Sequence, residues 1–248
     1  MPRITPLRLA AACTLALVLS LTLVAGATAK GVSAELRVVG KRSQVLAEQE
    51  VRTGPAISVK TSPKATCFGK GTGGSGKPVP IQPNTAMGAL AQAAKSNPAL
   101  RPLAVSDSFS FGLALCGIGK SLATGGLSWY LKVDHKGAQV SGDKVKLRSG
   151  DDVLWALASY PYPNELVLEA PGAVTAGMPF TVHVFSYDEK GKRRPLAGAT
   201  VTGAAAPTGA DGATTVTLGA TTALVATHGK EIPSPAADVC VGTPACQQ

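Results

Sequence analysis

Short runs of alternating apolar and polar residues, divided by glycine and proline, constrain the fold of this chain most strongly. A period of two is typical of half-buried strands, whereas an amphipathic helix repeats its apolar residues every three or four positions. The turns between such runs need residues that accept unusual backbone angles, and the chain supplies 28 glycines and 18 prolines. The sequence therefore predicts a mostly β protein of the α+β class.

One segment departs from this alternation and predicts a helix. Thr85 can cap a helix over residues 86–95, in which apolar residues recur at helical spacing, and Asn97-Pro98 ends it. The segment 61–83 is rich in Gly, Ser and Pro and contains no acidic residue, so we expect a long, basic, irregular loop there. The strands expected in the first half are residues 34–39, 45–52, 56–60, 109–116, 129–133, 144–147 and 153–157.

The second half shows shorter strands at regular spacing. The segment 161–164 resembles a hinge, and Val/Thr/Ala-rich runs separated by glycine follow it, which is typical of a β-sandwich. We expect one domain over residues 30–162, a sandwich over 163–241 and a C-terminal tail over 242–248. The strands expected in the sandwich are residues 165–169, 179–187, 199–203, 213–218 and 222–227.

The first 29 residues read as a cleavable secretory signal peptide. Arg3 and Arg8 precede an apolar stretch over residues 9–25, and Ala27-Thr28-Ala29 supplies the small residues of a cleavage site. Nothing else in the sequence is apolar over a length that spans a membrane, so no span is expected after cleavage. These features predict a secreted protein, extracellular or associated with the cell wall.

Four cysteines remain after cleavage, an even number that predicts two disulfides in an oxidising compartment. Three connectivities are possible. The close spacing of Cys240 and Cys246 makes a local bridge the simplest pairing, and Cys67 and Cys116 then pair by exclusion. A zinc site is the rival interpretation, but no Cys-x-x-Cys spacing supports it.

The charge balance bears on possible partners. Removal of residues 1–29 takes away two of the 24 basic residues and none of the 15 acidic ones, which changes the formal net charge from +9 to +7. A basic protein attracts anionic neighbours such as cell-wall polymers, although the same charge also keeps a secreted protein in solution. Aromatic residues make up only 4% of the chain, which argues against a base-stacking nucleic-acid surface.

Two segments imitate catalytic motifs without completing them. The glycine-rich run 71–77 resembles a phosphate-binding loop, but Pro78 follows where that loop needs a hydroxyl residue and a helix. Ser121 lies in a sequence similar to a nucleophile elbow, but Gly125-Gly126 prevents the helix that an elbow requires. We therefore expect no catalytic residue, with a secreted hydrolase as the weakest alternative.

Titratable residues also lack a pattern that predicts chemistry. The histidines His135, His183 and His228 are dispersed, and we expect each to be a solvated surface residue. Glu165 and Glu169 share one face of a strand, but at about 3.3 Å per residue they lie too far apart for a glycosidase pair. The sequence therefore predicts no metal site and no cofactor.

A pattern between residues 126 and 155 resembles the transcobalamin C-terminal-like domain. It reads Gly-x-x-Trp-Tyr-x-x-Val, then a hairpin turn, then Gly-Asp-x-Val-x-Trp. The resemblance implies a β-grasp-like fold with one helix on a curved sheet, and in transcobalamin-type proteins this domain closes over a cobalamin. Here Asp134-His135 stands where the family's turn usually has Asn-Gly. The matching residues are Gly126, Trp129, Tyr130, Val133, Gly150, Asp151, Val153 and Trp155.

The second half is similar to bacterial immunoglobulin-like modules of the invasin or carboxypeptidase-regulatory type. The similarity rests on residues 195–201 and on Thr-Gly-Ala-Asp-Gly at 208–212, whose glycines supply turns with positive φ. Such modules usually act as spacers, adhesive units or structural caps. The resemblance therefore implies a binding or structural role for this half.

The aromatic residues Trp129, Tyr130 and Trp155 are the candidate ligand-binding residues. Because neighbouring strand residues face opposite sides, Tyr130 should point away from the face that carries Trp129. Core packing is the ordinary role of both tryptophans. We expect a secreted, non-catalytic binding or structural protein of the cell envelope, whose partner is an anionic wall component or another envelope protein. The alternative is a small-molecule binding protein for a cobalamin-like ligand.

Overall fold

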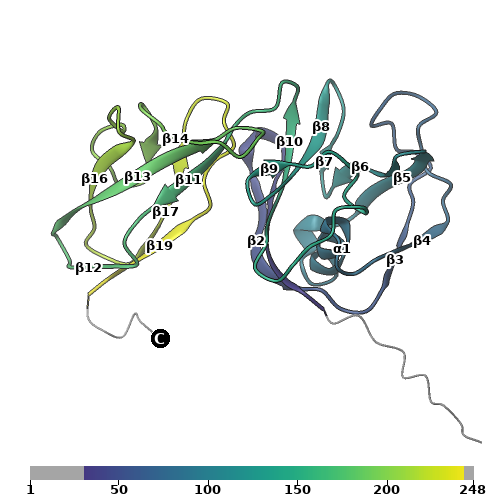
Figure 1. Cartoon of the computed structure of the whole chain (residues 1–248), viewed down its shortest axis with the longest axis horizontal. Helices are drawn as coiled ribbons and strands as arrows, with labels where there is room; N and C mark the ends of the chain where they lie inside the picture. Colours follow the sequence, from purple (N-terminus) through teal and green to yellow (C-terminus); the bar gives the residue numbers. More distant parts are fainter. Residues whose placement is uncertain (1–30, 243–248) are drawn as a thin grey trace, which may run out of the picture. The chain divides into compact units, whose positions relative to one another are not determined.

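A computed structural model describes residues 31–242, so the signal-peptide prediction for residues 1–29 lies outside the described part. The fold is mostly β, with one α-helix among the described residues, as the alternating pattern predicts (Figure 1). Residues 31–242 belong to one compact unit. None of the helices in the described part is long and apolar enough to cross a membrane.

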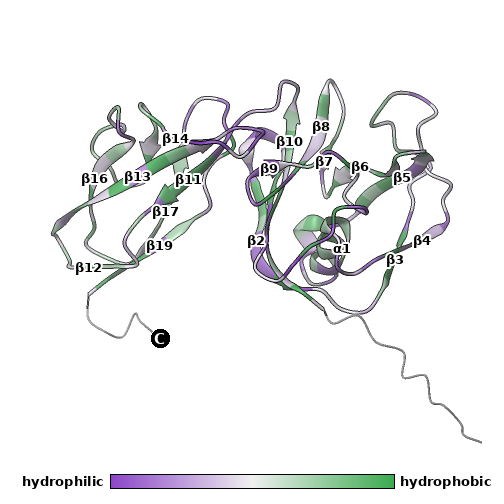
Figure 2. Ribbon diagram, viewed as in Figure 1, coloured by the Kyte–Doolittle hydropathy of each residue, from purple (hydrophilic) through white to green (hydrophobic). Residues whose placement is uncertain are grey.

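The largest sheet has five strands in the order β2-β1-β10-β8-β9. Its parallel pair is β1 with β10, and the other neighbours are antiparallel. Within this sheet β1 and β10 have the most buried residues, whereas the edge strand β2 mixes exposed, half-buried and buried residues. Figure 2 shows both hydrophilic and hydrophobic segments along β2. The strands are β1 (Ser33–Val39), β2 (Val45–Arg52), β8 (Leu127–Val133), β9 (Lys136–Gly137) and β10 (Asp152–Ser159).

The helix α1 (Ala86–Ser96) packs its apolar side into the core of this half. Thr85 caps it as predicted, since its hydroxyl oxygen accepts a hydrogen bond of 3.0 Å from the Gly88 amide. A short turn of 3-10 helix, η2 (Pro98–Leu100), follows it directly. Figure 1 shows α1 between the main sheet and the strands β5 and β6.

Two smaller sheets complete the first half. In one, β3 (Ile57–Lys60) pairs with β4 (Pro78–Ile81), and in the other β5 (Leu103–Phe109) pairs with β6 (Gly112–Ile118), which also pairs with β7 (Ser121–Leu122). A second 3-10 turn, η1 (Lys41–Ser43), joins β1 to β2.

The second half contains only strands and loops among its described residues. A four-stranded sheet places β13 between β11 and β14 and pairs it with β16 as well, β19 joins β12 to β17, and β15 pairs with β18. Val182 and Val184 of β13 are fully buried, as their alternation predicts. The strands are β11 (Glu165–Glu169), β12 (Ala173–Val174), β13 (Pro179–Tyr187), β14 (Arg193–Pro195), β15 (Thr200–Val201), β16 (Ala213–Thr217), β17 (Thr222–Leu224), β18 (Ala226–Thr227) and β19 (Ala237–Val241).

Each half has its own hydrophobic core, drawn from residues 34–157 in the first and 168–239 in the second. A third, small cluster of Val39, Leu154, Ala156 and Ile232 joins strands of the first half to the second. The predicted boundary at residues 162 and 163 lies between the two large cores. The hinge role of residues 161–164 stays a prediction.

Four local predictions were wrong. The expected strand 222–227 is interrupted at Val225, since β17 pairs with β19 and β18 pairs with β15. Residues 144–147 are not a strand, because Ala86 donates to the Val145 carbonyl and Leu147 to the Asn84 carbonyl, so this segment wraps around the start of α1. Residues 109–116 are not one strand, because the chain turns between Phe109 and Gly112, which pair across a hairpin.

The predicted loop 61–83 also contains a strand, β4. Its register pairs Val79 with Val59 and Ile81 with Ile57. The two prolines of β4 occupy the alternate positions, and an edge strand tolerates proline where no amide has to donate to its partner. Alternation of proline with Val and Ile is the signal that could have predicted this strand.

The disulfide between Cys67 and Cys116 is present, as predicted. It ties the basic loop to β6, and the two cysteines have a sequence separation of 49. Cys246 lies outside the described residues, so its pairing with Cys240 stays a prediction.

Candidate ligand-binding site

The hairpin formed by β8 and β9 opens into a pocket. Lys132 and Val133 pair with β9, and the Ala138 amide donates to the Leu131 carbonyl at 2.9 Å. Beyond that bond the chain leaves β8, and a cavity of about 300 Å³ lies between residues 128–131 and residues 138–142. Because β9 covers only the end of β8, most of the outer edge of this strand faces the cavity.

Two tryptophans reach the pocket from one face of the sheet. The register pairs Trp155 with Leu131 and Trp129 with Leu157, so the two indoles are diagonal neighbours on adjacent strands. Both belong to the core of the first half, and they are the only tryptophans of the chain. Their fluorescence therefore reports on this pocket and on the core of the first half.

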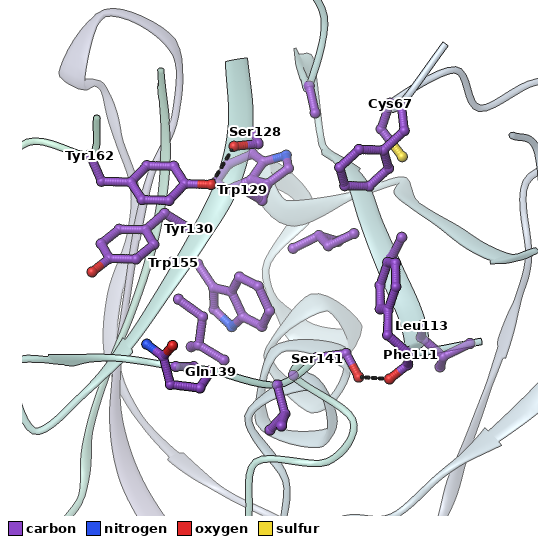
Figure 3. A pocket seen from close by; sticks show the side chains of 18 of the residues that line it. Cys67, Phe111, Leu113, Ser128, Trp129, Tyr130, Gln139, Ser141, Trp155 and Tyr162 are labelled. Atoms are coloured by element: carbon purple, nitrogen blue, oxygen red, sulfur yellow. Dashed lines mark hydrogen bonds between the residues drawn. The ribbon is translucent and has the colours of Figure 1, made fainter. Parts of the chain in front are cut away.

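Tyr130 reaches the pocket from the opposite face, as alternation along β8 predicts. Its ring stacks on Tyr162 with 4.1 Å between centroids, and the Tyr162 hydroxyl lies 2.8 Å from the Ser128 hydroxyl. Figure 3 shows this tyrosine pair on one side of the site and Phe111 on the other, with Trp155 between them.

Phenylalanines form the outer wall. The Phe68 ring meets Phe109 edge-on at 5.2 Å, and Phe109 stacks on Phe111 at 5.0 Å. Phe68 and Phe111 are 58% and 52% exposed, which is unusual for such large apolar side chains. The disulfide holds this wall in place, because Cys67 is bonded to β6 and precedes Phe68 directly.

Gly142 lets the backbone approach Trp155 closely. A Cβ atom at this position would lie 2.6 Å from two atoms of the Trp155 ring, so any other residue would displace the indole or the segment. A glycine in such a place marks a close approach of backbone to a neighbouring group. The inner wall of the pocket therefore depends on this residue.

Three polar atoms at the pocket have no hydrogen-bond partner in the described part of the chain. They are the indole Nε1 atoms of Trp129 and Trp155 and the hydroxyl oxygen of Tyr130, and all three are buried. Buried polar groups are nearly always paired, and leaving one unpaired costs about 1–3 kcal/mol. All three belong to residues that line one cavity.

The second half of the chain supplies one residue to the pocket. Glu189, in the turn between β13 and β14, is the one lining residue with a formal charge. It forms no ion pair within residues 31–242, and its side chain passes Gly137 beside the Tyr130 ring. Burial, and secondly the Glu189 charge, raise the pKa of Tyr130 well above its ordinary value, so the hydroxyl stays protonated.

The structure brings together the three predicted site residues, Trp129, Tyr130 and Trp155. Sequence reasoning did not assign Phe68, Phe111 or Glu189 to the site, since none of them belongs to β8 or β10. For Phe68, a useful signal was its position directly after Cys67, which was predicted to form a disulfide.

A second polar cluster lies where the halves meet, centred on Glu165. The Arg37 Nη2 atom lies 3.0 Å from Glu165 Oε1, and Lys132 Nζ lies 3.3 Å from Oε2. These three side chains are at most 3% exposed. Arg37 also donates to the Pro233 carbonyl and Lys132 to the Tyr187 carbonyl, so strands of both halves hold the cluster.

His135 belongs to this cluster, which corrects the prediction of a solvated surface histidine. Its side chain is 26% exposed, its Nδ1 lies 3.2 Å from Glu165 Oε2, and its ring stacks on Tyr187. The tight turn explains this position: Asp134 and His135 both have positive φ, at 48° and 65°. Such a two-residue turn matches the twist of a hairpin and directs the imidazole toward the second half.

Burial and neighbouring charges shift the pKa values of three side chains in this cluster. Burial would raise the pKa of Glu165, but His135, Arg37 and Lys132 outweigh it and hold that pKa below its ordinary value. Burial and the Glu165 charge raise the pKa of Asp152. Burial likewise lowers the pKa of Lys132, against the attraction of Glu165.

The donor atoms of His135, Asp152 and Glu165 lie within 4.8 Å of one another, a spacing that a metal ion could use. However, both carboxylate oxygens of Glu165 already contact cationic side chains. A metal ion there would face the charges of Arg37 and Lys132. The arrangement is therefore a network of ion pairs that joins the two halves.

The two imitated catalytic motifs have structural roles. The Ser121 hydroxyl accepts a hydrogen bond from the Lys41 amide at 3.2 Å, and Ser121 is buried in β7 rather than placed before a helix. In the glycine-rich run, Ser75 donates through its amide and its hydroxyl to Asp107, at 2.6 and 2.7 Å. An acidic side chain thus occupies the donors that a phosphate would need.

No protein-family model matches the chain, and no curated protein is significantly similar to it. The candidate site is therefore interpreted from its own geometry.

Proposed function

We propose that this protein is a secreted, non-catalytic binding protein that holds a small molecule in the pocket beside β8. One observation carries the proposal: the unpaired polar atoms of Trp129, Tyr130 and Trp155 surround a single cavity. A ligand with hydrogen-bond acceptors would pair these groups. Since each unpaired group costs about 1–3 kcal/mol, the ligand would recover energy that the empty protein lacks.

The shape of the site supports a small ligand. A volume of about 300 Å³ is at the lower end of the usual range for ligand pockets, and aromatic walls with a few polar groups are typical of them. The resemblance to the transcobalamin C-terminal-like domain suggests a cobalamin-like ligand. The cavity suits one end of such a molecule rather than a whole corrinoid.

Two features support a location outside the cytoplasm. Residues 1–29 have the composition of an export signal, and the Cys67–Cys116 disulfide is typical of an oxidising compartment. The proposal therefore includes secretion to the medium or the cell envelope.

Ligand capture can be tested with the secreted protein itself. Native mass spectrometry of the purified protein should show a bound small molecule, and Trp155→Phe should reduce its occupancy several-fold, because this change keeps an aromatic ring but removes the indole donor. Phe180→Leu, in the core of the second half, is the matched control and should retain the ligand.

Titrations of tryptophan fluorescence provide the second test. Both tryptophans line the pocket, so a bound ligand should change their emission. The proposal would be refuted if native mass spectra show only the ligand-free protein and tryptophan emission stays unchanged in titrations with cobamides, flavins and small organic cations.

A second candidate function rests on the basic loop. Lys60, Lys64, Lys70 and Lys77 are exposed and form no ion pair within the described residues, and Phe68 is exposed beside them. Such a surface suits an anionic wall polymer or another envelope protein. Binding to wall preparations should weaken steeply as salt rises, whereas insensitivity to salt would exclude this role.

A further inference from the structure

The charge and walls of the pocket indicate a ligand class, an inference that rests on the proposed function. We infer that the pocket beside β8 selects an organic cation that also carries a hydrogen-bond acceptor, such as a hydroxyl-bearing quaternary ammonium compound. Three features that lie side by side at the pocket support this inference. They are aromatic ring faces, the carboxylate of Glu189, and the unpaired indole donors of Trp129 and Trp155.

The aromatic faces are the first part of the argument. Ring faces carry partial negative charge, and a cation over such a face gains about 0.5–2 kcal/mol, which corresponds to roughly 2-fold to 30-fold in affinity. A trimethylammonium group exploits this best, because its charge is spread over methyl groups that also pack against the rings. The aromatic lining residues are Phe68, Phe111, Trp129, Tyr130, Trp155 and Tyr162.

The formal charge of the residues that line the pocket is the second part of the argument. No Lys, Arg or His side chain is among the described residues that line it, and Glu189 contributes its one formal charge. The lining of the pocket is therefore negatively charged, whereas the chain as a whole has a formal net charge of +9. Lys136 of β9 and Lys190 line a neighbouring cavity together with Glu189, but neither forms an ion pair with it in the described part.

The orientation of donors is the third part. The indole nitrogens of Trp129 and Trp155 can only donate hydrogen bonds, so a purely cationic ligand would leave them unpaired. A hydroxyl or carbonyl oxygen on the same ligand would pair with one of them. The two requirements together define a compact cation with an oxygen acceptor.

A matched pair of probes separates charge from shape. Choline and 3,3-dimethylbutan-1-ol have the same hydroxyl and nearly the same shape, but only choline is charged. Tryptophan fluorescence titrations of the full secreted protein should show choline binding at least about tenfold more tightly than the neutral alcohol. Tetramethylammonium, which lacks the acceptor, should bind several-fold more weakly than choline.

Variants test the role of the carboxylate. Glu189→Gln should reduce choline affinity several-fold and leave the neutral alcohol unchanged, because the change removes the charge and keeps the shape. Glu50→Gln, an exposed acidic residue of β2 outside the pocket, is the matched control and should behave as the wild type. Vesicles of phosphatidylcholine, titrated in parallel, distinguish a lipid headgroup from a free solute.

Three results would overturn the inference: equal or tighter binding of the neutral alcohol, no binding of choline, or an unchanged preference in Glu189→Gln. If a neutral ligand still binds with a fluorescence change, the proposed small-molecule function stands and only the ligand class is wrong. If native spectra also show a bare protein, the proposed function fails as well.

Discussion

At the scale of single residues, Glu165 shows how its neighbours determine the state of a side chain. An isolated carboxylate at 1% exposure would be costly to keep ionised. Here Arg37 and Lys132 balance its charge, and His135 contributes a further contact. Removing one member of a buried ion pair usually costs about 3–5 kcal/mol, since the other charges are left buried without a partner.

Glu165→Gln should therefore lower the free energy of unfolding by about 3–5 kcal/mol near neutral pH. The pKa of Glu165 is lowered in the folded state, so its stabilising effect is present above its unfolded pKa and lost as pH falls through the folded pKa. The gap between wild type and variant should thus shrink in acid. Urea unfolding at a series of pH values measures this difference in the free energy of unfolding. A difference that does not depend on pH would contradict this account.

Asp152→Asn serves as the opposite control in the same cluster. The pKa of Asp152 is raised in the folded state, so its ionised form destabilises the fold at neutral pH. Its amide substitute should leave stability unchanged or slightly higher at neutral pH, with the advantage lost as pH falls below the unfolded pKa. A large loss of stability would show that Asp152 holds the cluster together as an anion.

At the scale of elements, the disulfide is the link between the basic loop and the pocket wall. It closes a loop with a sequence separation of 49, for which the chain-entropy model gives a stabilisation of about 4 kcal/mol. It also positions Phe68 beside Phe109 and Phe111. The loop 61–77 would otherwise be anchored mainly by polar contacts such as that of Ser75 with Asp107.

Replacing both cysteines, as Cys67→Ser with Cys116→Ser, should lower the free energy of unfolding by about 2–4 kcal/mol. It should also weaken ligand binding, because the outer wall loses its anchor. Urea unfolding and fluorescence titration of the same sample measure both effects. Unchanged binding in a destabilised but folded variant would show that Phe68 contributes nothing to the site.

At the scale of the whole molecule, polar contacts join the two halves. Besides the Glu165 cluster, the Ala236 amide donates to Glu48 at 2.8 Å and the Gly137 amide to the Glu189 carbonyl at 2.9 Å. Each half keeps its own core, but separating them would expose buried charges. We therefore expect the two halves to unfold together rather than independently.

Urea unfolding of the secreted protein should show one cooperative transition. Tryptophan fluorescence reports on the first half, and amide hydrogen exchange in β13 reports on the second, so the two probes should give the same midpoint. Glu165→Gln should separate the midpoints. Two transitions in the wild type would show that the junction does not couple the halves.

Local patterns were sufficient to predict the elements whose signal lies within one segment. Alternation identified β1, β2, β10, β11 and β13, and the Thr85 cap with Asn97-Pro98 placed α1 within one residue of its end. The same reasoning failed at 144–147, because the amides of Ala86 and Leu147 bind across the start of α1 and no local pattern records that contact.

The sequence by itself determined that residues 31–242 form strands and one α-helix, since side-chain alternation and capping are properties of neighbouring residues, and it favoured the Cys67–Cys116 bridge among three possible pairings. Only the tertiary structure decided what surrounds Trp155 and Glu165. Phe68 and Glu189 meet at one pocket, and Arg37 meets Glu165 across 128 residues. Burial, unpaired donors and shifted pKa values depend on such distant neighbours, because the energy of a polar group is set by what packs around it in space.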